Sequence, residues 1–169
     1  MKLKPLDIVL LEGDKIDIAE RIVMESSGSA FSHCVTCKNK QGDVFDATLG
    51  GILDRNIKDY AGRYFTICRF KENIPDTKVK EMLAWCEEKQ RTCEGYDILA
   101  WLGFATRIRY FESENRWYCS ELPYWMYEEA GYSLTVPQLT FVYPNFFLLN
   151  AHFANLLRGG DEDDYNFEF

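Results

Sequence analysis

The chain has 169 residues, 47% hydrophobic and 15% aromatic, which is enough for one sizeable core in a single domain. Its 19 Lys and Arg residues against 27 Asp and Glu give a net charge of -8, so we expect no nucleic-acid binding and no anionic-membrane binding. The first apolar run is broken by Asp7 and Glu12, and no stretch reaches the ~18 apolar residues of a membrane helix. We therefore expect no signal peptide, no transmembrane segment, a cytoplasmic location and six mostly reduced cysteines.

The first half of the chain reads as strands with one early helix. Residues 7–13 form a short apolar run closed by glycine, which predicts a buried strand. Residues 14–29 carry apolar residues at helical spacing and end in a polar, glycine-containing stretch. Residues 31–38 and 43–48 predict a hairpin around a turn-rich connection, and the aromatic and β-branched residues of 63–71 predict a further strand.

The second half reads as helices. After a proline, the apolar period becomes helical, and Asp76 or Thr77 is expected to cap that helix. A second helix is expected near Asp97, which would be its cap. A third follows the stretch "RWYCSELPYW", where Pro123 is tolerated only in the first turn and Gly131 supplies a stop.

Cys119 lies just before the third of these helices. A helix N-terminus stabilises a thiolate through its dipole, and its free N–H groups can receive the oxyanion of a tetrahedral intermediate. Free cysteine is also among the most frequently buried residues, and on local pattern alone a structural thiol is the better interpretation.

A cysteine nucleophile needs a base and a group that orients the base. The chain has two histidines: His33 in a predicted strand and His152 in an apolar C-terminal stretch. Asp46 lies across the predicted turn from His33 and could orient it. A core or surface histidine and a solvated aspartate are the simpler alternatives.

The motifs "LDIVLLEG", "SAFSHCVT", "VFDATLGGI", "GYDILAWLGF", "WYCSELPYWMYEEAG" and "VYPNFF" follow one another along residues 6–147. In this order they resemble the permuted papain-like thiol hydrolases of the NlpC superfamily, the YiiX-like group. The resemblance implies an α+β, circularly permuted papain-like (NlpC-type) fold, with an antiparallel β-sheet or small barrel packed against helices. Leu6 stands where that group usually has glycine, and Pro123 stands where it usually has valine.

The same resemblance implies a cysteine hydrolase that cleaves an amide, ester or thioester bond of a peptide or acyl-containing substrate. Cys119 matches the nucleophile, His33 the general base and Asp46 the third polar residue, which is more commonly glutamate. Ser32, Ser120 and Tyr118 flank these positions and are the candidates for substrate binding, with capping and turn roles as alternatives for the two serines.

Four other cysteines raise the question of a metal site. Cys34 and Cys37 form a CxxC pair, to which Cys86 and Cys93 could add two thiol ligands for zinc. An offset of three residues in a strand points two side chains to opposite faces. We therefore expect no metal and no cofactor, and we expect Cys34 and Cys86, together with Cys68, to lie in the core.

Residues 1–158 are expected to form one hydrolase domain and residues 159–169 an acidic, aromatic tail. The tail would be either a solvated end or, from Asp161 to Phe169, a docking peptide for a basic, apolar-pocketed protein partner. The alternative to an enzyme is a noncatalytic binding or structural module that keeps the fold and uses its surface or tail to dock a partner.

Overall fold

A computed structural model describes residues 2–95, 116–134 and 142–160 of the chain. Its elements are β1 (Ile8–Glu12), α1 (Ile18–Ser27), β2 (Phe31–Cys37), β3 (Asp43–Thr48), β4 (Gly51–Asn56), the 3-10 helix η1 (Ile57–Tyr60), β5 (Phe65–Phe70), α2 (Asp76–Thr92), α4 (Glu121–Glu129), α5 (Phe146–Leu149) and β6 (Phe153–Gly159). Residues 161–169 of the expected tail and the helix expected near Asp97 lie outside the described residues, and β6 runs to Gly159.

The six strands form one antiparallel sheet in the order β4-β3-β2-β1-β5-β6. The four predicted strands correspond to β1, β2, β3 and β5, and the predicted hairpin is the β2–β3 pair. Both edge strands, β4 and β6, were not predicted from the sequence. The fold class is thus a mixed α+β arrangement of an antiparallel sheet and helices.

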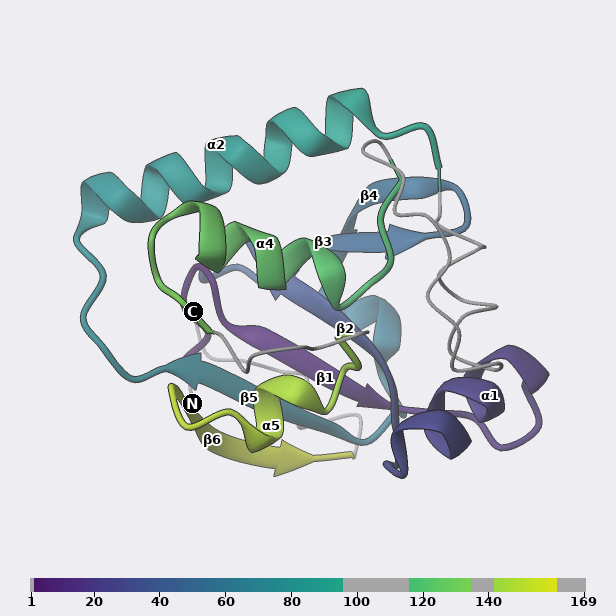
Figure 1. The fold of residues 1–169 in the computed structure, drawn as a ribbon. Helices are drawn as coiled ribbons and strands as arrows, with labels where there is room; N and C mark the ends of the chain where they lie inside the picture. Colours follow the sequence, from purple (N-terminus) through teal and green to yellow (C-terminus); the bar gives the residue numbers. More distant parts are fainter. Residues whose placement is uncertain (1, 96–115, 135–141, 161–169) are drawn as a thin grey trace.

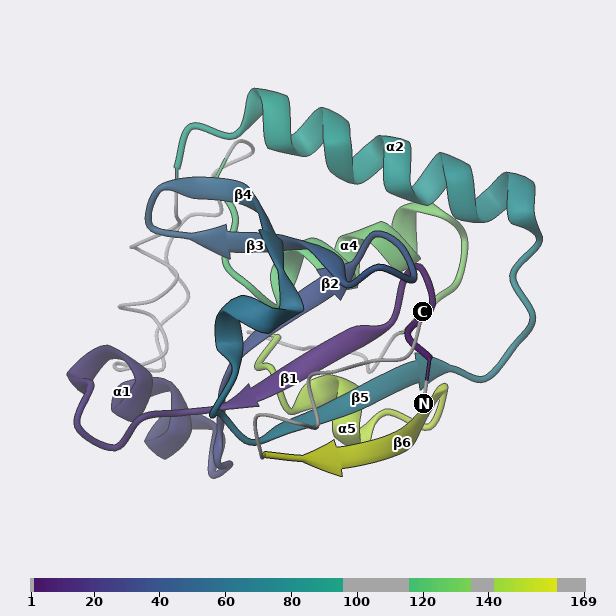
Figure 2. The ribbon, with the colours of Figure 1, turned by 180° about the vertical axis from the view of Figure 1, so that it is seen from behind.

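The helices α2, α4 and α5 cover one face of this sheet (Figure 1). Because side chains alternate along a strand, each face has its own core cluster. The cluster under the helices includes Leu10, Phe45, Met126 and Phe147. The opposite face, seen from behind in Figure 2, packs Val9, Val35, Phe65 and Ile67 against η1.

The helix starts follow local chain chemistry. Pro75 occupies the N-cap of α2 and makes no side-chain cap bond, so the expectation that Asp76 or Thr77 caps this helix is wrong. Asp76 instead lies in the first turn, where the helix dipole favours a carboxylate. In α4 Pro123 is in the first turn, and Gly131, at φ 85°, follows the last turn as predicted. None of the described helices is long and apolar enough to cross a membrane.

The turn before β1 fixes the sheet against α4. Leu6 has φ 71°, the left-handed conformation that usually needs glycine. The buried Asp7 carboxylate accepts hydrogen bonds from Arg69 Nε and Nη2 of β5, at 2.7 and 2.6 Å. Tyr127 of α4 donates its hydroxyl to the Leu6 carbonyl at 3.1 Å. The start of β1 is therefore tied to both β5 and α4, the helix that follows Cys119.

Candidate active site

Cys119 is buried two residues before Glu121, the first residue of α4. Its two neighbours are both hydrogen-bonded to Val142. Ser120 Oγ donates to the Val142 carbonyl at 2.6 Å, and Tyr118 Oη accepts the Val142 N–H at 3.3 Å. These bonds hold the segment that carries the thiol from both sides. They also occupy the Ser120 hydroxyl, and the substrate-binding role of Ser120 and Tyr118 stays a prediction.

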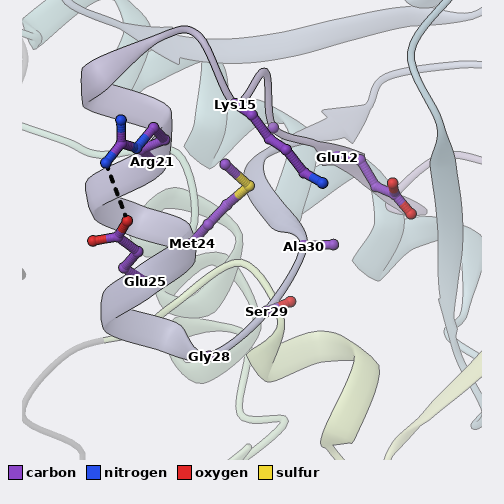
Figure 3. A pocket seen from close by; sticks show the side chains of 9 residues that line it. Glu12, Lys15, Arg21, Met24, Glu25, Gly28, Ser29 and Ala30 are labelled. Atoms are coloured by element: carbon purple, nitrogen blue, oxygen red, sulfur yellow. Dashed lines mark hydrogen bonds and ion pairs between the residues drawn. The ribbon is translucent and has the colours of Figure 1, made fainter.

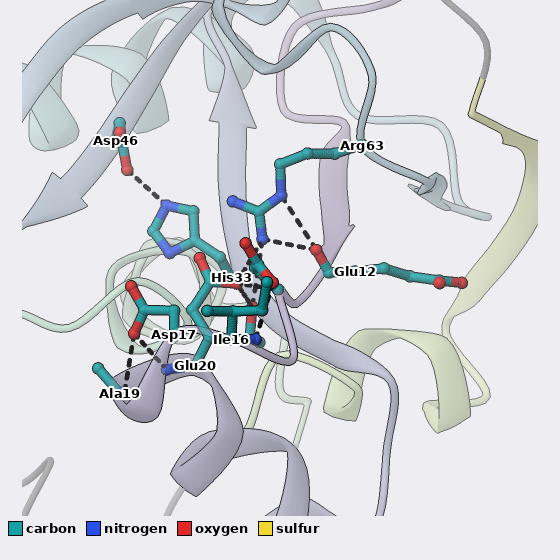
Figure 4. A network of polar contacts seen from close by, with 10 residues as sticks. Glu12, Ile16, Asp17, Ala19, Glu20, His33, Asp46 and Arg63 are labelled. Carbon is teal, nitrogen blue, oxygen red and sulfur yellow. Dashed lines mark hydrogen bonds and ion pairs between the residues drawn. The ribbon is translucent and has the colours of Figure 1, made fainter.

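His33 and Asp46 come from the neighbouring strands β2 and β3. These strands pair at only two positions, Thr36 with Phe45 and Cys37 with Val44, and neither pair includes the two site residues. His33 Nε2 and Asp46 Oδ1 are 2.6 Å apart (Figure 4). The side chains are 18% and 3% exposed, respectively. The predicted orienting contact between acid and imidazole is thus present in the structure.

Two further side chains hold the Asp46 carboxylate. Its Oδ2 accepts the Tyr60 hydroxyl at 2.6 Å and lies 3.0 Å from Arg55 Nε. Burial alone would raise the pKa of Asp46, but the bonds from His33 and Tyr60 and the Arg55 charge hold it below its usual range. Sequence analysis missed Tyr60 and Arg55, because they belong to η1 and β4, which were not predicted.

Cys119 and His33 shift each other's pKa in the direction that favours a thiolate and an imidazolium. The pKa of Cys119 is held well below its usual 9.0, chiefly by a hydrogen bond from Cys34. Burial opposes this effect, and the charge and hydrogen bond of His33 add to it. Burial disfavours the imidazolium, but the Cys119 charge and the bonds to Asp46 and Cys119 raise the pKa of His33 from 6.5 to about 10. Because the Asp46 carboxylate contacts Nε2 of His33, Nδ1 is the ring nitrogen that can interact with the Cys119 sulfur. His33 therefore interacts both with the Asp46 carboxylate and with the Cys119 thiol.

Ser32 precedes His33 but faces a different network. The β1–β2 register shifts between Leu11 and Glu12, which makes Ser32 the extra residue of a bulge. Its hydroxyl donates to Glu20 of α1 at 3.1 Å and accepts from Arg63 Nη2 at 3.3 Å (Figure 4). The Ser32 hydroxyl thus ties α1 to the sheet, and its predicted substrate-binding role stays a prediction.

Cys34 and Cys37 point to opposite faces of the sheet, as their spacing predicted. Cys34 belongs to the same core cluster as Cys119, and Cys37 belongs to the cluster on the other face. The predicted burial of Cys34, Cys68 and Cys86 is confirmed. Sequence analysis did not identify one contact: Cys34 Sγ donates a hydrogen bond to the Cys119 carbonyl at 3.2 Å.

A cavity of about 640 Å³ lies beside α1, between that helix and the ends of β1 and β2 (Figure 3). Glu12, Lys15, Arg21 and Met24 contribute to its wall. None of the three proposed catalytic residues lines it. This cavity is therefore separate from Cys119, His33 and Asp46.

Comparisons with known proteins identify the fold. No family model matches the sequence, and no curated protein matches it. Among solved structures, the metalloprotein YiiX from Escherichia coli O157:H7, a DUF1105 protein, is similar with a TM-score of 0.72 and 14% sequence identity. The match covers 94% of this chain and 99% of that chain. The chain therefore has a YiiX-like fold.

The metal in that description belongs to the YiiX protein. In residues 2–95, 116–134 and 142–160 of this chain, no three His, Cys, Asp or Glu side chains converge so that they could hold an ion. Cys34 and Cys37 lie on opposite faces of β2, which prevents them from chelating one ion. The described donor set does not fit a metal centre, and the mechanism below uses none.

Proposed function

We propose that the chain is a cysteine hydrolase or acyltransferase with a permuted papain-like architecture of the NlpC type. Cys119 would be the nucleophile, His33 the general base and acid, and Asp46 the residue that orients His33. The substrate would be a peptide or another acyl-containing molecule with an amide, ester or thioester bond. The observation that supports the proposal is the 2.6 Å contact between His33 of β2 and Asp46 of β3, together with the lowered pKa of Cys119 and the raised pKa of His33.

In the first half-reaction the Cys119 thiolate attacks the substrate carbonyl carbon and forms a tetrahedral oxyanion. The oxyanion collapses, the bond to the leaving group breaks, and the His33 imidazolium gives its proton to the departing nitrogen, oxygen or sulfur. The product is a thioester on Cys119. In the second half-reaction neutral His33 takes a proton from water, or from another acceptor, which attacks the thioester and releases the acyl group.

The start of α4 offers donors for the oxyanion. Glu121 and Leu122 direct their N–H groups to the Tyr118 carbonyl at 3.1 and 3.4 Å. The N–H groups of Cys119 and Ser120 are then the candidates to bind the oxyanion, and the helix dipole favours negative charge at the same place. Asp46 would keep the imidazole ring in the orientation that presents Nδ1 to the sulfur.

The pH dependence of Cys119 alkylation tests the proposal. Iodoacetamide labelling followed by mass spectrometry should show Cys119 reacting well below pH 9.0 in the wild type, because the thiolate persists there. In His33→Ala the reaction should need a higher pH, because the imidazolium partner is gone. A rate that rises only at the pH of an ordinary thiol, and that His33→Ala leaves unchanged, would favour the noncatalytic module instead.

The chain supplies matched controls for this experiment. His152→Ala removes the other histidine, which lies just before β6 with its imidazole near Glu72, and should leave the Cys119 profile unchanged. Cys93 is a half-buried thiol in the same sample and reports general alkylation conditions. A chromogenic acyl ester should also leave an acyl group on Cys119 that is absent from Cys119→Ala.

The proposal includes a cytoplasmic location. All six cysteines are unpaired, which suits a reducing compartment, and an ionised nucleophilic thiol needs reducing conditions to persist.

A further inference from the structure

Cys34 lies against the proposed nucleophile on the helix-covered side of the sheet. The two thiols come from β2 and from the segment before α4, 85 positions apart in the chain. Cys34 Sγ is 3.2 Å from the Cys119 carbonyl oxygen, and both residues are buried in one cluster. The Cys34 side chain is also the largest cause that lowers the pKa of the Cys119 thiol. The nucleophile therefore has a second thiol as a direct neighbour.

The two thiols have opposite character. Cys119 is the ionised one, and an ionised thiol is the form that reacts with peroxides. Burial, together with the bond to Cys119 and its charge, raises the pKa of Cys34 well above the usual 9.0. Cys34 thus stays protonated and unreactive while Cys119 is a thiolate. Once the charge on Cys119 is lost, one of the causes that keep Cys34 protonated is lost as well.

We propose that Cys34 is the resolving cysteine of Cys119, so that a peroxide converts the pair into a reversible Cys34–Cys119 disulfide. In the first step the Cys119 thiolate attacks a peroxide oxygen, the O–O bond breaks, and the departing hydroxide takes the proton of the His33 imidazolium. In the second step the Cys34 sulfur attacks the sulfenic acid, the S–O bond breaks, and hydroxide leaves with the Cys34 proton as water. Two thiols lose two electrons, and hydrogen peroxide becomes two molecules of water.

The disulfide would remove the nucleophile reversibly and protect it from irreversible oxidation to sulfinic acid. The inference rests on the proposed function only in requiring a reactive Cys119 thiolate. Its readout is covalent chemistry rather than hydrolysis, so it is tested separately from the substrate and the reaction.

Limited hydrogen peroxide treatment of the full chain tests the proposal. After the remaining thiols are blocked, digestion with trypsin without reductant should give a cross-link between the peptides of residues 22–38 and 117–158. A thiol reductant should remove this cross-link and restore Cys119 alkylation. In Cys34→Ser the cross-link should be absent, and Cys119 should accumulate as sulfinic acid that the reductant does not reverse.

Cys37→Ser is the matched control, since Cys37 is on the same tryptic peptide and equally buried, but on the other face of β2. The cross-link should persist in this variant, which assigns it to Cys34 even if Cys34→Ser folds poorly. Oxidation of wild-type Cys119 without any cross-link, or a cross-link that disappears in Cys37→Ser, would overturn the proposal. If Cys119 reacts with peroxide no faster than Cys93, both this inference and the proposed function fail. Fast oxidation of Cys119 without the cross-link would refute the resolving role of Cys34 but not the proposed function.

Discussion

Replacement of Cys119 by alanine should lower the pKa of His33. The rise from 6.5 to about 10 corresponds to about 5 kcal/mol in favour of the protonated ring, at ~1.4 kcal/mol per pKa unit. Burial favours the neutral His33 ring. Among the interactions that favour the protonated ring, the charge on Cys119 is the largest, and the contacts with Asp46 supply most of the rest. In Cys119→Ala the pKa of His33 should therefore fall by at least about one unit, while the Asp46 contact remains.

NMR titration of the imidazole protons measures this change directly, because the chain has only two histidines. The His152 resonance, from a residue outside the proposed site, identifies the His33 resonance by elimination. A His33 signal that titrates near 6.5 in the wild type would refute the ionised pair. An elevated value that Cys119→Ala leaves unchanged would refute the assignment of the rise to the thiolate.

The shifted pKa values of His33 and Cys119 also make the free energy of unfolding depend on pH. The pKa of His33 is raised, so its stabilisation is complete below pH 6.5 and is lost as the pH rises through about 10. The pKa of Cys119 is lowered, so its stabilisation is present above pH 9.0 and is lost as the pH falls through the folded value. Between pH 6.5 and 9.0 the folded and unfolded pairs hold the same number of protons, and the two dependences cancel.

In Cys119→Ala that cancellation is lost. Where the NMR titration finds the pKa of His33 in the variant still above 6.5, the free energy of unfolding of the variant, relative to the wild type, should fall as the pH rises from 6.5 to that pKa, by at most about 1.4 kcal/mol per pH unit. Urea unfolding at several pH values between 6.5 and 9.0 measures this difference, and the other titrating groups are common to both proteins. Parallel profiles for the two proteins would contradict the coupling.

Three further substitutions probe the supports of the site. Asp46→Asn cannot satisfy all three partners of the carboxylate, so it should lower the free energy of urea unfolding by about 1–3 kcal/mol and shift alkylation of the active-site thiol to higher pH. Arg69→Ala removes the ion-pair partner of the buried Asp7 carboxylate, which among the described residues keeps only the Lys4 backbone N–H, and should cost about 3–5 kcal/mol in the same assay. Leu6→Gly should be more stable to urea than Leu6→Ala, by about 1 kcal/mol, because only glycine adopts φ 71° without strain.

Each of these substitutions has its comparison. Arg21→Ala breaks an exposed pair on α1 and should cost below about 1 kcal/mol, so an equal cost for Arg69→Ala would contradict the importance of the buried pair. An unchanged alkylation profile in Asp46→Asn would mean that the carboxylate does not support the imidazolium. If Leu6→Ala proves as stable as Leu6→Gly, the turn does not store backbone strain.

The interior strands could be predicted from the sequence and the edge strands could not. β1, β2, β3 and β5 carry runs of β-branched, aromatic and apolar residues between turn signals, and these local features suffice. β4 reads GILDRN and owes its strand character to pairing along all six residues of β3. β6 lies in an apolar stretch whose pattern suits a helix as well as a strand, and its pairing with β5 decides between them.

The candidate site residues could be selected from the sequence by type and order, but the side chains that support them could be found only from the fold. Cys119, His33 and Asp46 stand in a recognisable sequence context, whereas Tyr60 and Arg55 reach Asp46 only because η1 and β4 fold back beside β3. Cys34 carries no such signal, because a buried cysteine in an apolar strand is ordinary.

Strand β2 assigns a separate role to each of three consecutive residues. Its bulge turns Ser32 toward α1, His33 then meets Asp46, and Cys34 faces α4 and Cys119. Because side chains alternate along a strand, loss of one residue from this stretch would exchange the faces of the imidazole and the thiol. The helix N-terminus favours a thiolate, but only this register brings a protonated imidazole on one side and a thiol donor on the other. The register of β2 therefore decides whether the proposed nucleophile Cys119 has these two partners or is one more buried cysteine.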